Sequence, residues 1–338
     1  MCTRIFWNTN DLAKTVSRCL DWAVDDEPDL WFFPRGTSHT GDAGGGPHLD
    51  DISGTGTDRV ERAHTWTSRY ASLGVTMWRL GTIDGLNERG LAAHTLYLNP
   101  EDAGFEPVDE RPAVAHIQWA QYVLDHYTTV AEVVADLGRV RIASPRIRGE
   151  HMGAHLAIED PSGDSAIIEP IDGRLVVHHG PEFRVMSNSP SLDQQLANLE
   201  RYRPFGGDQN PPGDISSLDR FVRANYFLHY LPEPESTAEA VAGVFQLIEN
   251  VSVPYGAPYT DGSVYPTWWH SGADLTNRVY YFESTRSPSV FWIDLAKLAD
   301  LAAGGGVLRL NPRDVSLVGD ETERLRGSAA CETVATLP

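Results

Sequence analysis

Hydrophobic and polar residues alternate along much of the first hundred positions, and a period of two is typical of β-strands. Residues 2–8 alternate in this way, a turn at 8–11 follows, and residues 15–22 are expected to return as the second strand of a hairpin. Further strands are expected at 30–33, 65–70, 74–78 and 91–98, with a turn at 85–90 between the last two. The chain is therefore expected to begin with an antiparallel sheet.

The pattern changes to a helical period after residue 112. Residues 113–127 carry an apolar stripe, and residues 130–137 end at Gly138, a residue type that commonly ends helices. Later helices are expected at 192–202, 217–230, 237–250 and 295–301, and later strands at 155–159, 166–169, 175–178, 184–186, 278–283, 290–293 and beyond 306. This order is not the strict βαβ alternation of a doubly wound parallel sheet, and it favours antiparallel sheets with helices on their outer faces.

Residues 36–58 are rich in Gly, Asp, Ser and Thr and show no periodicity. We expect a long flexible loop here, because segments of this length without secondary structure are usually functional lids or disordered. Their acidic residues do not have the spacing of a calcium-binding loop. There is no internal repeat and no clear linker, so residues 2–338 are expected to form a single domain.

The composition is that of a globular protein, with 41% hydrophobic and 22% charged residues among 338. The charge is acidic, since 47 Asp and Glu against 27 Lys and Arg give a formal net charge of −20. Such a chain repels phosphate backbones and anionic lipids, so neither nucleic acid nor a membrane is an expected partner. No apolar run approaches the roughly 20 residues of a membrane span and no signal peptide precedes Cys2, so we expect a cytoplasmic protein.

Three cysteines, Cys2, Cys19 and Cys331, are odd in number and too scattered for a disulfide framework or a metal site. Two pairs of histidines stand close in sequence, at 151 and 155 and at 178 and 179, without an acidic ligand pattern beside them. A zinc site is therefore not expected. We expect neither a metal nor an organic cofactor.

Cys2 is the candidate nucleophile, because removal of Met1 would make it the first residue. A terminal cysteine carries a thiol and a free α-amine, and the reference pKa of an α-amine is about 7.7–8.0. Near neutral pH the amine can take the thiol proton, so one residue supplies both nucleophile and general base. The alternative is an ordinary buried cysteine in an N-terminal strand.

Arg18 and Asp21 are the next candidates, in the expected return strand. An arginine near a thiol favours the thiolate, and a carboxylate can hold and orient an α-amine. Residues three apart in a strand point to opposite faces, so both can approach one site only near a strand end or a kink. The alternative is a surface ion pair worth 0–1 kcal/mol.

Five short segments then carry a family resemblance. They are, in order, Cys2, Arg18 with Asp21, residues 87–91 (NERGL), residues 186–190 (MSNSP) and residues 212–221 (PGDISSLDRF). With the stretch 279–294 as a sixth similarity, the chain resembles the choloylglycine hydrolase family, which includes bile salt hydrolases and penicillin V acylases. Each segment alone is weak evidence, whereas the ordered set is specific and extends from residue 2 to about 300.

The resemblance implies an α+β fold, the four-layer αββα sandwich of the N-terminal nucleophile hydrolases. It also implies that Cys2 is the nucleophile and its amine the base, with Arg18 beside the thiol and Asp21 holding the amine. Asn188 would place its side-chain amide in the oxyanion hole, and Arg220 would be a second active-site arginine. For Asn188 the alternative is a plain turn residue before Ser-Pro.

Two departures from the family pattern bear on substrate and assembly. The position that is often asparagine in bile salt hydrolases is Tyr97 here, as in penicillin V acylases, and the oxyanion is expected to find its second donor at or near this residue. The segment 190–212 is shorter than the hairpin that helps many members to form tetramers, so a homo-oligomer built in that way is in doubt.

Three aromatic residues are candidates for the wall of an acyl pocket. They are Trp22, Phe32 and Trp78, and an acyl group needs such an apolar surface. Packing in the protein core is the alternative for each.

The sequence thus predicts a hydrolase of non-peptide linear amides whose partner is a small acyl amide. Phenoxyacetyl amides such as penicillin V and N-acyl homoserine lactones are the leading substrates, and conjugated bile salts are the alternative. A catalytically silent small-molecule binder on the same fold and a zinc-dependent amidase are the rival hypotheses.

Overall fold

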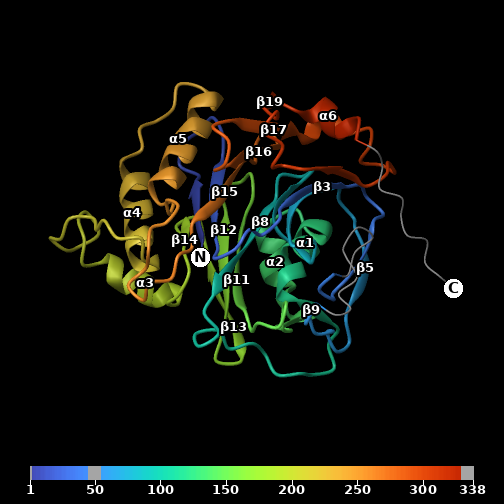
Figure 1. Cartoon of the computed structure of the whole chain (residues 1–338), viewed down its shortest axis with the longest axis horizontal. Coiled ribbons are helices and arrows are strands. Elements are labelled where there is room, and N and C mark those ends of the chain that lie inside the picture. Colours follow the sequence, from blue (N-terminus) through green and yellow to red (C-terminus); the bar gives the residue numbers. More distant parts are fainter. Residues whose placement is uncertain (1, 45–54, 329–338) are drawn as a thin grey trace.

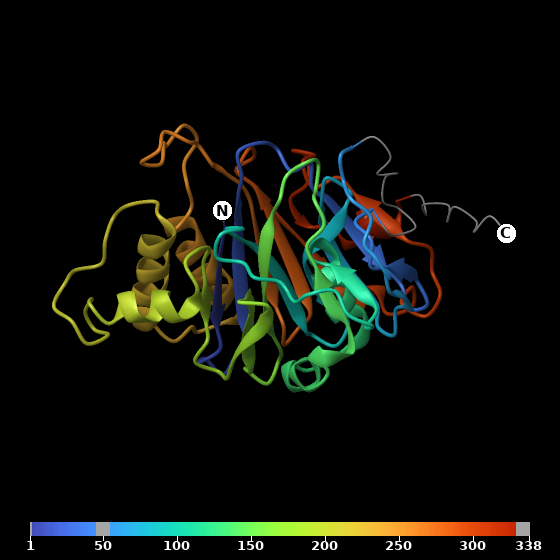
Figure 2. The same cartoon turned by 90° about the horizontal axis from the view of Figure 1, so that it is seen from below.

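Two large β-sheets lie face to face in the computed structural model, which describes residues 2–44 and 55–328. Helices cover the outer face of each sheet (Figures 1 and 2). The architecture is an α+β four-layer αββα sandwich, as predicted.

The first sheet has seven strands. In spatial order they are β14 (Val185–Met186), β1 (Cys2–Trp7), β2 (Thr15–Asp21), β15 (Thr267–Asp274), β16 (Val279–Ser284), β17 (Val290–Asp294) and β19 (Gly319–Asp320). Neighbouring strands are antiparallel except β17 and β19. The hairpin of β1 and β2 therefore lies inside the sheet, with another strand on each side.

The second sheet has eight strands, and all its neighbours are antiparallel. In spatial order they are β13 (Arg174–His179), β12 (Ser165–Ile171), β11 (Gly153–Glu159), β8 (Ala92–Leu98), β7 (Gly81–Asn87), β6 (Ser72–Met77), β3 (Asp29–Phe33) and β18 (Leu308–Leu310). Two small two-stranded sheets stand apart: β4 (Ser38–Thr40) with β5 (Thr65–Thr67), and β9 (Ala113–Ala115) with β10 (Arg141–Ala143).

Helices α4 (Ser217–Tyr230) and α5 (Thr237–Asn250) pack on the first sheet, and α3 (Leu192–Leu199) packs on α4. Helices α1 (Trp119–His126) and α2 (Val130–Ala135) pack on the second sheet. In Figure 2 the yellow-to-orange helices α3–α5 lie on the left, beyond the strands, and the green helices lie at the lower right. A short helix, α6 (Thr322–Arg326), lies near β17 and β18.

The central strands are buried along their whole length, because one face meets the other sheet and the other face meets helices. Every residue of β1, β2, β3 and β11 is buried. Helices α4 and α5 begin at serine N-caps, where Ser216 and Ser236 accept hydrogen bonds from main-chain amides in the first turn.

Several predicted elements were wrong. Strand β15 was not predicted, and β7 covers residues 81–87, where a turn was expected at 85–90. The helix expected from residue 113 begins at Trp119, because Ala113–Ala115 is a strand. Gly138 lies inside a 3₁₀ turn rather than ending a helix.

The expected loop at 36–58 was also partly wrong, because it contains strand β4. Residues 45–54 of that loop, and Cys331, lie outside the described residues. Residues 190–212, where a family hairpin was expected to be short, contain helix α3.

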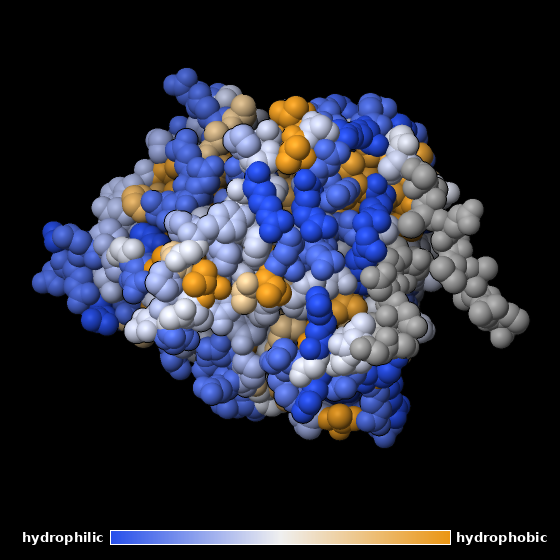
Figure 3. Space-filling model, viewed as in Figure 1, coloured by the Kyte–Doolittle hydropathy of each residue, from blue (hydrophilic) through white to orange (hydrophobic). Residues whose placement is uncertain are grey.

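Among residues 2–44 and 55–328, no helix has the length and apolar character needed to cross a bilayer. On the face in Figure 3, hydrophilic residues predominate and hydrophobic ones occur in small groups, in keeping with the acidic composition.

Candidate active site

Cys2 begins strand β1, and only 2% of its surface is exposed. It lies opposite Leu20 of β2, and Arg4 lies opposite Arg18. Because side chains alternate along a strand, Cys2, Arg4 and Arg18 share one face of this hairpin. This face meets the second sheet, since Arg4 pairs with Glu159 of β11.

Arg18 lies directly beside the thiol. Its Nη2 donates to Cys2 Sγ at 3.5 Å and to the Thr95 carbonyl at 3.3 Å, and its guanidinium stacks 4.7 Å above the Trp269 ring. Burial lowers the pKa of Arg18, but Cys2 and Asp84 raise it by more, so the pKa ends above its ordinary value. A permanent positive charge therefore faces the sulfur.

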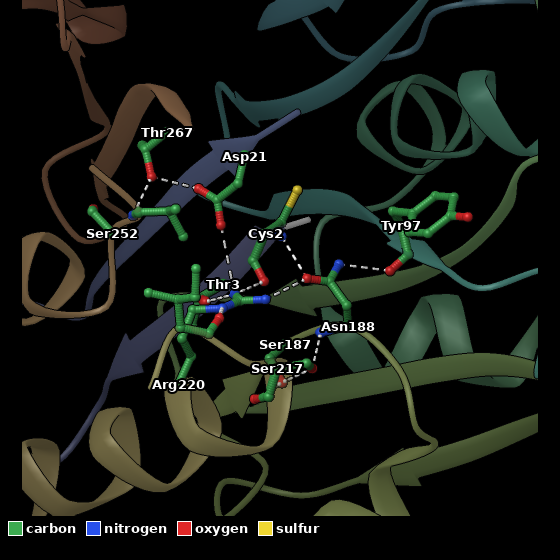
Figure 4. A network of polar contacts seen from close by, with 12 residues as sticks. Cys2, Thr3, Asp21, Tyr97, Ser187, Asn188, Ser217, Arg220, Ser252 and Thr267 are labelled. Carbon is green, nitrogen blue, oxygen red and sulfur yellow. Dashed lines mark hydrogen bonds and ion pairs between the residues drawn. The ribbon is translucent and has the colours of Figure 1, made fainter. Parts of the chain in front are cut away.

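Arg220 approaches the same residue from the other face of the sheet, on helix α4 (Figure 4). Its Nη1 donates to the Cys2 carbonyl at 2.6 Å and to Thr3 Oγ1 at 2.5 Å. The same nitrogen lies 3.6 Å from Asp21 Oδ2, and Thr267 donates to the other oxygen of Asp21 at 2.6 Å. Arg220 is fully buried, and its contacts hold the main chain of Cys2 from the face of the sheet opposite the thiol.

Asn188 completes the group, two residues after strand β14. Its Oδ1 accepts from the Cys2 main-chain nitrogen at 2.6 Å and from Arg220 Nη2 at 2.8 Å. Its Nδ2 donates to the Tyr97 carbonyl at 2.7 Å. A carboxamide nitrogen carries two hydrogens, so one remains for a negatively charged oxygen of a reacting acyl group.

The expected role of Asp21, to hold the Cys2 nitrogen as a free α-amine, stays a prediction, because that amine forms only when Met1 is removed. The hydrogen bond of that nitrogen goes to Asn188, and Asp21 pairs with Arg220. Met1, whose removal would turn this nitrogen into an amine, lies outside the described residues.

A small cavity of about 50 Å³, open to solvent on one side, lies beside Cys2 and Arg18. Its lining is largely apolar and comes from both sheets: Leu20, Trp22, Met77, Ile83, Thr95, Leu96, Tyr97, His116, Ile117, Met152, Gly153 and Ala154. Burial lowers the pKa of His116 to about 4, so this histidine is neutral near pH 7. Arg18 is therefore the charged side chain of the cavity at that pH.

Trp22 and Tyr97 form one wall of the cavity, with their rings edge to face at 5.2 Å. Trp78 stands behind this wall, 6.2 Å from Trp22. Burial raises the pKa of Tyr97, so its phenol keeps its proton. Of the three aromatic residues proposed as pocket wall, Trp22 lines the cavity, and Trp78 supports it.

Phe32 lies elsewhere. It is 1% exposed on β3, opposite Leu73 of β6 and Leu308 of β18, in the core between the layers. The structure thus gives Phe32 the core position that was the alternative for it.

Several residues near the site were missed from the sequence. Asp84 and His94, paired across β7 and β8, lie behind Arg18, and His116 lies in the cavity lining. An aspartate in a run of glycine and apolar residues is a possible signal for Asp84, but the end of that run has the pattern of a turn. His94 and His116 gave no signal in the sequence.

The histidines considered as zinc ligands are occupied otherwise. His155 bonds to Glu169 at 3.1 Å and His179 to Asp164 at 2.8 Å. Over the part of the chain that the structure describes, no group of three or more His, Cys, Asp or Glu residues could hold a metal ion.

The arrangement suits acyl transfer. A thiol lies beside a fixed cation, an amide donor stands near its main-chain nitrogen, and an apolar cavity opens in front of it. These are the parts that a nucleophilic attack on a carbonyl carbon requires.

Comparison with known proteins gives a consistent picture. Residues 2–303 match the family described as linear amide C–N hydrolases, choloylglycine hydrolase family. The chain is 36% identical to a penicillin V acylase of Pectobacterium atrosepticum over 92% of its length and 85% of the relative's. It is 26% identical to a bile salt hydrolase/transferase of Bifidobacterium longum over 86% of its length and 94% of the relative's.

Solved structures agree. A penicillin V acylase from Agrobacterium tumefaciens superposes with a TM-score of 0.82 at 35% identity, covering 98% of both chains. A variant of the conjugated bile acid hydrolase from Clostridium perfringens gives a TM-score of 0.74 at 20% identity, covering 92% of this chain and 96% of that one. At 20% identity this similarity supports the fold alone.

Proposed function

The chain belongs to the choloylglycine hydrolase family of linear amide C–N hydrolases, and from this premise we propose that it is an acylase of the penicillin V acylase type. The observation that carries the proposal is the apolar cavity that opens directly at the Cys2 thiol. The cavity receives the acyl group, and the amine half of the substrate leaves.

The reaction begins at Cys2. The α-amine freed by loss of Met1 takes the thiol proton, and the sulfur attacks the carbonyl carbon of the amide. The proton then passes to the leaving nitrogen as the carbon–nitrogen bond breaks, which leaves a thioester. Water, activated by the same amine, hydrolyses the thioester and releases the acid and the free thiol.

Asn188 supports this reaction by donating to the oxyanion. Its Oδ1 is held by Cys2 and Arg220, so the amide plane cannot turn. A fixed donor stabilises developing charge without reorganisation during the reaction, and loss of one such donor typically costs 10²–10³ in kcat. A second donor at or near Tyr97 completes the oxyanion hole in this proposal.

The three charged residues have distinct parts in the proposal. Arg18 stabilises the thiolate at 3.5 Å. Arg220 fixes the carbonyl of Cys2 and the amide of Asn188. Asp21 neutralises Arg220 and orients the α-amine when this group carries a proton.

The substrate proposal rests on the cavity wall. Trp22 and Tyr97, packed edge to face, make an apolar wall, and the neutral His116 adds no charge, which suits a phenoxyacetyl or straight acyl chain. A steroid acid is bulkier than the acyl groups that this cavity favours. In addition, a net charge of −20 does not attract the anionic conjugates of bile acids from a distance.

Comparison of substrates on one enzyme preparation tests the proposal. We expect kcat/KM for penicillin V or a long-chain acyl homoserine lactone to exceed that for glycocholate or taurocholate at least tenfold. Tenfold corresponds to about 1.4 kcal/mol of differential transition-state binding, a modest demand on two aromatic contacts. Tyr97→Asn should narrow the ratio.

Equal or better turnover of the bile conjugates would overturn the substrate class and leave the nucleophile in place. A complete lack of turnover on every acyl amide would favour the silent binder instead. We also propose a cytoplasmic location. Residues 190–212 contain helix α3. The proposed chemistry requires no long hairpin in this segment and does not depend on a homo-oligomer.

A further inference from the structure

A row of buried charged groups crosses from the nucleophile into the second sheet. Arg18 Nη1 lies 3.4 Å from Asp84 Oδ2, and the same oxygen lies 2.6 Å from His94 Nδ1. His94 Nε2 lies 2.5 Å from Glu159 Oε1, and the other oxygen of Glu159 pairs with Arg4. His94 is 2% exposed and the other four residues are fully buried.

The register of the hairpin explains why this row exists. Arg4 and Arg18 are directly opposite each other in β1 and β2, on the same face. Like charges in this relation destabilise a sheet, and buried charges need partners. The facing sheet supplies two carboxylates, from β7 and β11, and His94 of β8 stands between them.

His94 is therefore held as an imidazolium. Both ring nitrogens lie within hydrogen-bond distance of a carboxylate oxygen, and only the doubly protonated ring can donate to both. Burial lowers the pKa of His94, but Asp84 and Glu159 raise it by more, to about 9. The charged groups around it are these two carboxylates with Arg4 and Arg18 beyond them, and the Tyr280 hydroxyl donates to Asp84.

We propose that His94 is a positioning residue for the reaction, which keeps the Arg18 guanidinium at the Cys2 sulfur by occupying the carboxylate that would otherwise capture it. The inference rests on the proposed function, in which Cys2 is the nucleophile. His94 contacts neither the substrate nor the reacting atoms and acts through Asp84 and Arg18.

The geometry gives the reason. Asp84 has one oxygen bonded by Tyr280 and the other bonded closely by His94, so Arg18 is left with the long contact of 3.4 Å. The arginine then keeps its Nη2 for the sulfur. Without the imidazolium, Asp84 would draw the guanidinium toward itself and away from Cys2.

The count of charges points the same way. Arg4, Arg18 and the His94 imidazolium are three cations against the carboxylates of Asp84 and Glu159. One positive charge is left over in a buried region, and a thiolate at Cys2 balances it. With a neutral side chain at position 94 this surplus disappears, and a buried thiolate would then be uncompensated.

The test compares His94→Gln with His155→Gln. His155 is a matched control, because it is equally buried, stands on β11 and pairs with a carboxylate, Glu169, outside the row. The readout is alkylation of Cys2 by iodoacetamide, followed by mass spectrometry of the N-terminal peptide. This readout needs no acyl substrate, so its failure is distinguishable from failure of the proposed function.

We expect His94→Gln to slow alkylation of Cys2 at pH 7.5 about tenfold and to lower kcat at least as much, with less than a threefold change in KM. His155→Gln should leave both rates near those of the wild type. The wild-type rate of turnover should also fall as pH rises through about 9, and this fall should be missing in His94→Gln. Alkylation of His94→Gln at the wild-type rate would overturn the proposal.

A second measurement decides the matter if His94→Gln does not fold. The wild-type enzyme, labelled with ¹⁵N-histidine, should show at pH 7.5 a ring with both nitrogens protonated, and nuclear Overhauser contacts with its neighbours on β7 and β11 assign this ring to His94. A neutral His94 ring at this pH would overturn the proposal. An imidazolium supports it, whatever substrate the enzyme prefers.

Discussion

At the scale of single residues, hydrogen bonds leave Cys2 and Asn188 few possible conformations. The Asn188 oxygen accepts from both Cys2 and Arg220, and its main-chain nitrogen donates to Ser217 Oγ at 3.0 Å. Loss of this side chain therefore removes a donor that is already oriented.

We expect Asn188→Ala to lower kcat by roughly 10²–10³ with a smaller change in KM, because an oxyanion donor acts mainly in the transition state. Steady-state kinetics with penicillin V measures both constants. Cys2→Ala, which removes one small side chain, should abolish turnover and serves as the reference for zero activity. A rise in KM alone would make Asn188 a ground-state binding residue.

The α-amine can be tested at the same scale. A variant with an uncleavable extension before Cys2 should be inactive, because an acylated nitrogen cannot accept the thiol proton. Intact-mass analysis confirms the extension, and the assay is run beside enzyme that has lost Met1. Full activity with the extension in place would rule out the N-terminal mechanism.

At the scale of elements, helix α1 places a buried carboxylate, Asp125, against Trp66 of strand β5. Asp125 accepts from Trp66 Nε1 at 2.7 Å and from Gln121 Nε2 at 2.9 Å, and burial raises its pKa to about 8. His39, 3.6 Å away, does not offset the charge, because burial lowers the pKa of His39 to about 3. The folded protein therefore favours a protonated Asp125.

The sign of the pH dependence follows. A carboxyl whose pKa is raised on folding contributes stability below its unfolded pKa of about 3.9, and this contribution is lost as pH rises to about 8. At pH 8.5 the wild type should have lost on the order of several kcal/mol of unfolding free energy from this group. Asp125→Asn has no such loss, because its side chain does not ionise. The side-chain amide of Gln121 can flip so that its oxygen accepts a hydrogen bond from the new amide group.

Urea denaturation at pH 5 and pH 8.5 measures the effect. Asp125→Asn should be more stable than the wild type at pH 8.5 and equal or less stable at pH 5. The same difference at both pH values would show that Asp125 is not protonated in the folded protein.

At the scale of the whole molecule, the site belongs to no single layer. Cys2 and Arg18 come from the first sheet, Asp84 from the second and Arg220 from a helix on the outer face. The site therefore requires that all these layers are packed together.

We expect activity and global structure to be lost together in urea. Turnover of penicillin V, tryptophan fluorescence and far-ultraviolet circular dichroism should show coincident midpoints, as for a single cooperative unit. Loss of activity at a clearly lower urea concentration would mean that the site opens before the rest of the domain.

Much of this fold could be predicted from the sequence, because the central strands have apolar runs and the helices α3–α5 have clear periods. Strand β15 could not, since its middle residues His270, Ser271 and Gly272 are polar or small. His270 is tolerated inside the sheet because it bonds to Ser252 and Glu283. Strand β7 escaped for a related reason, because its glycines and its asparagine resemble a turn.

The residues of the site likewise fall into those that the sequence could predict and those that it could not. Cys2, Arg18 and Asn188 could be proposed because each stands in a short motif with a fixed order. His94 could not, because nothing beside it in the chain distinguishes it, and its importance comes from Asp84 and Glu159 on neighbouring strands. Phe32 looked like a pocket residue only because aromatic residues on strands serve equally well in cores.

The place of Cys2 at the beginning of β1 also sets an order in time. The ribosome adds Cys2 before its partners, since Asn188 and Arg220 follow it by 186 and 218 positions. Strand β15, which flanks β2 inside the sheet, emerges later still, at Thr267–Asp274. A nascent chain thus carries its reactive thiol long before the site can assemble, which happens only after β15 has left the exit tunnel.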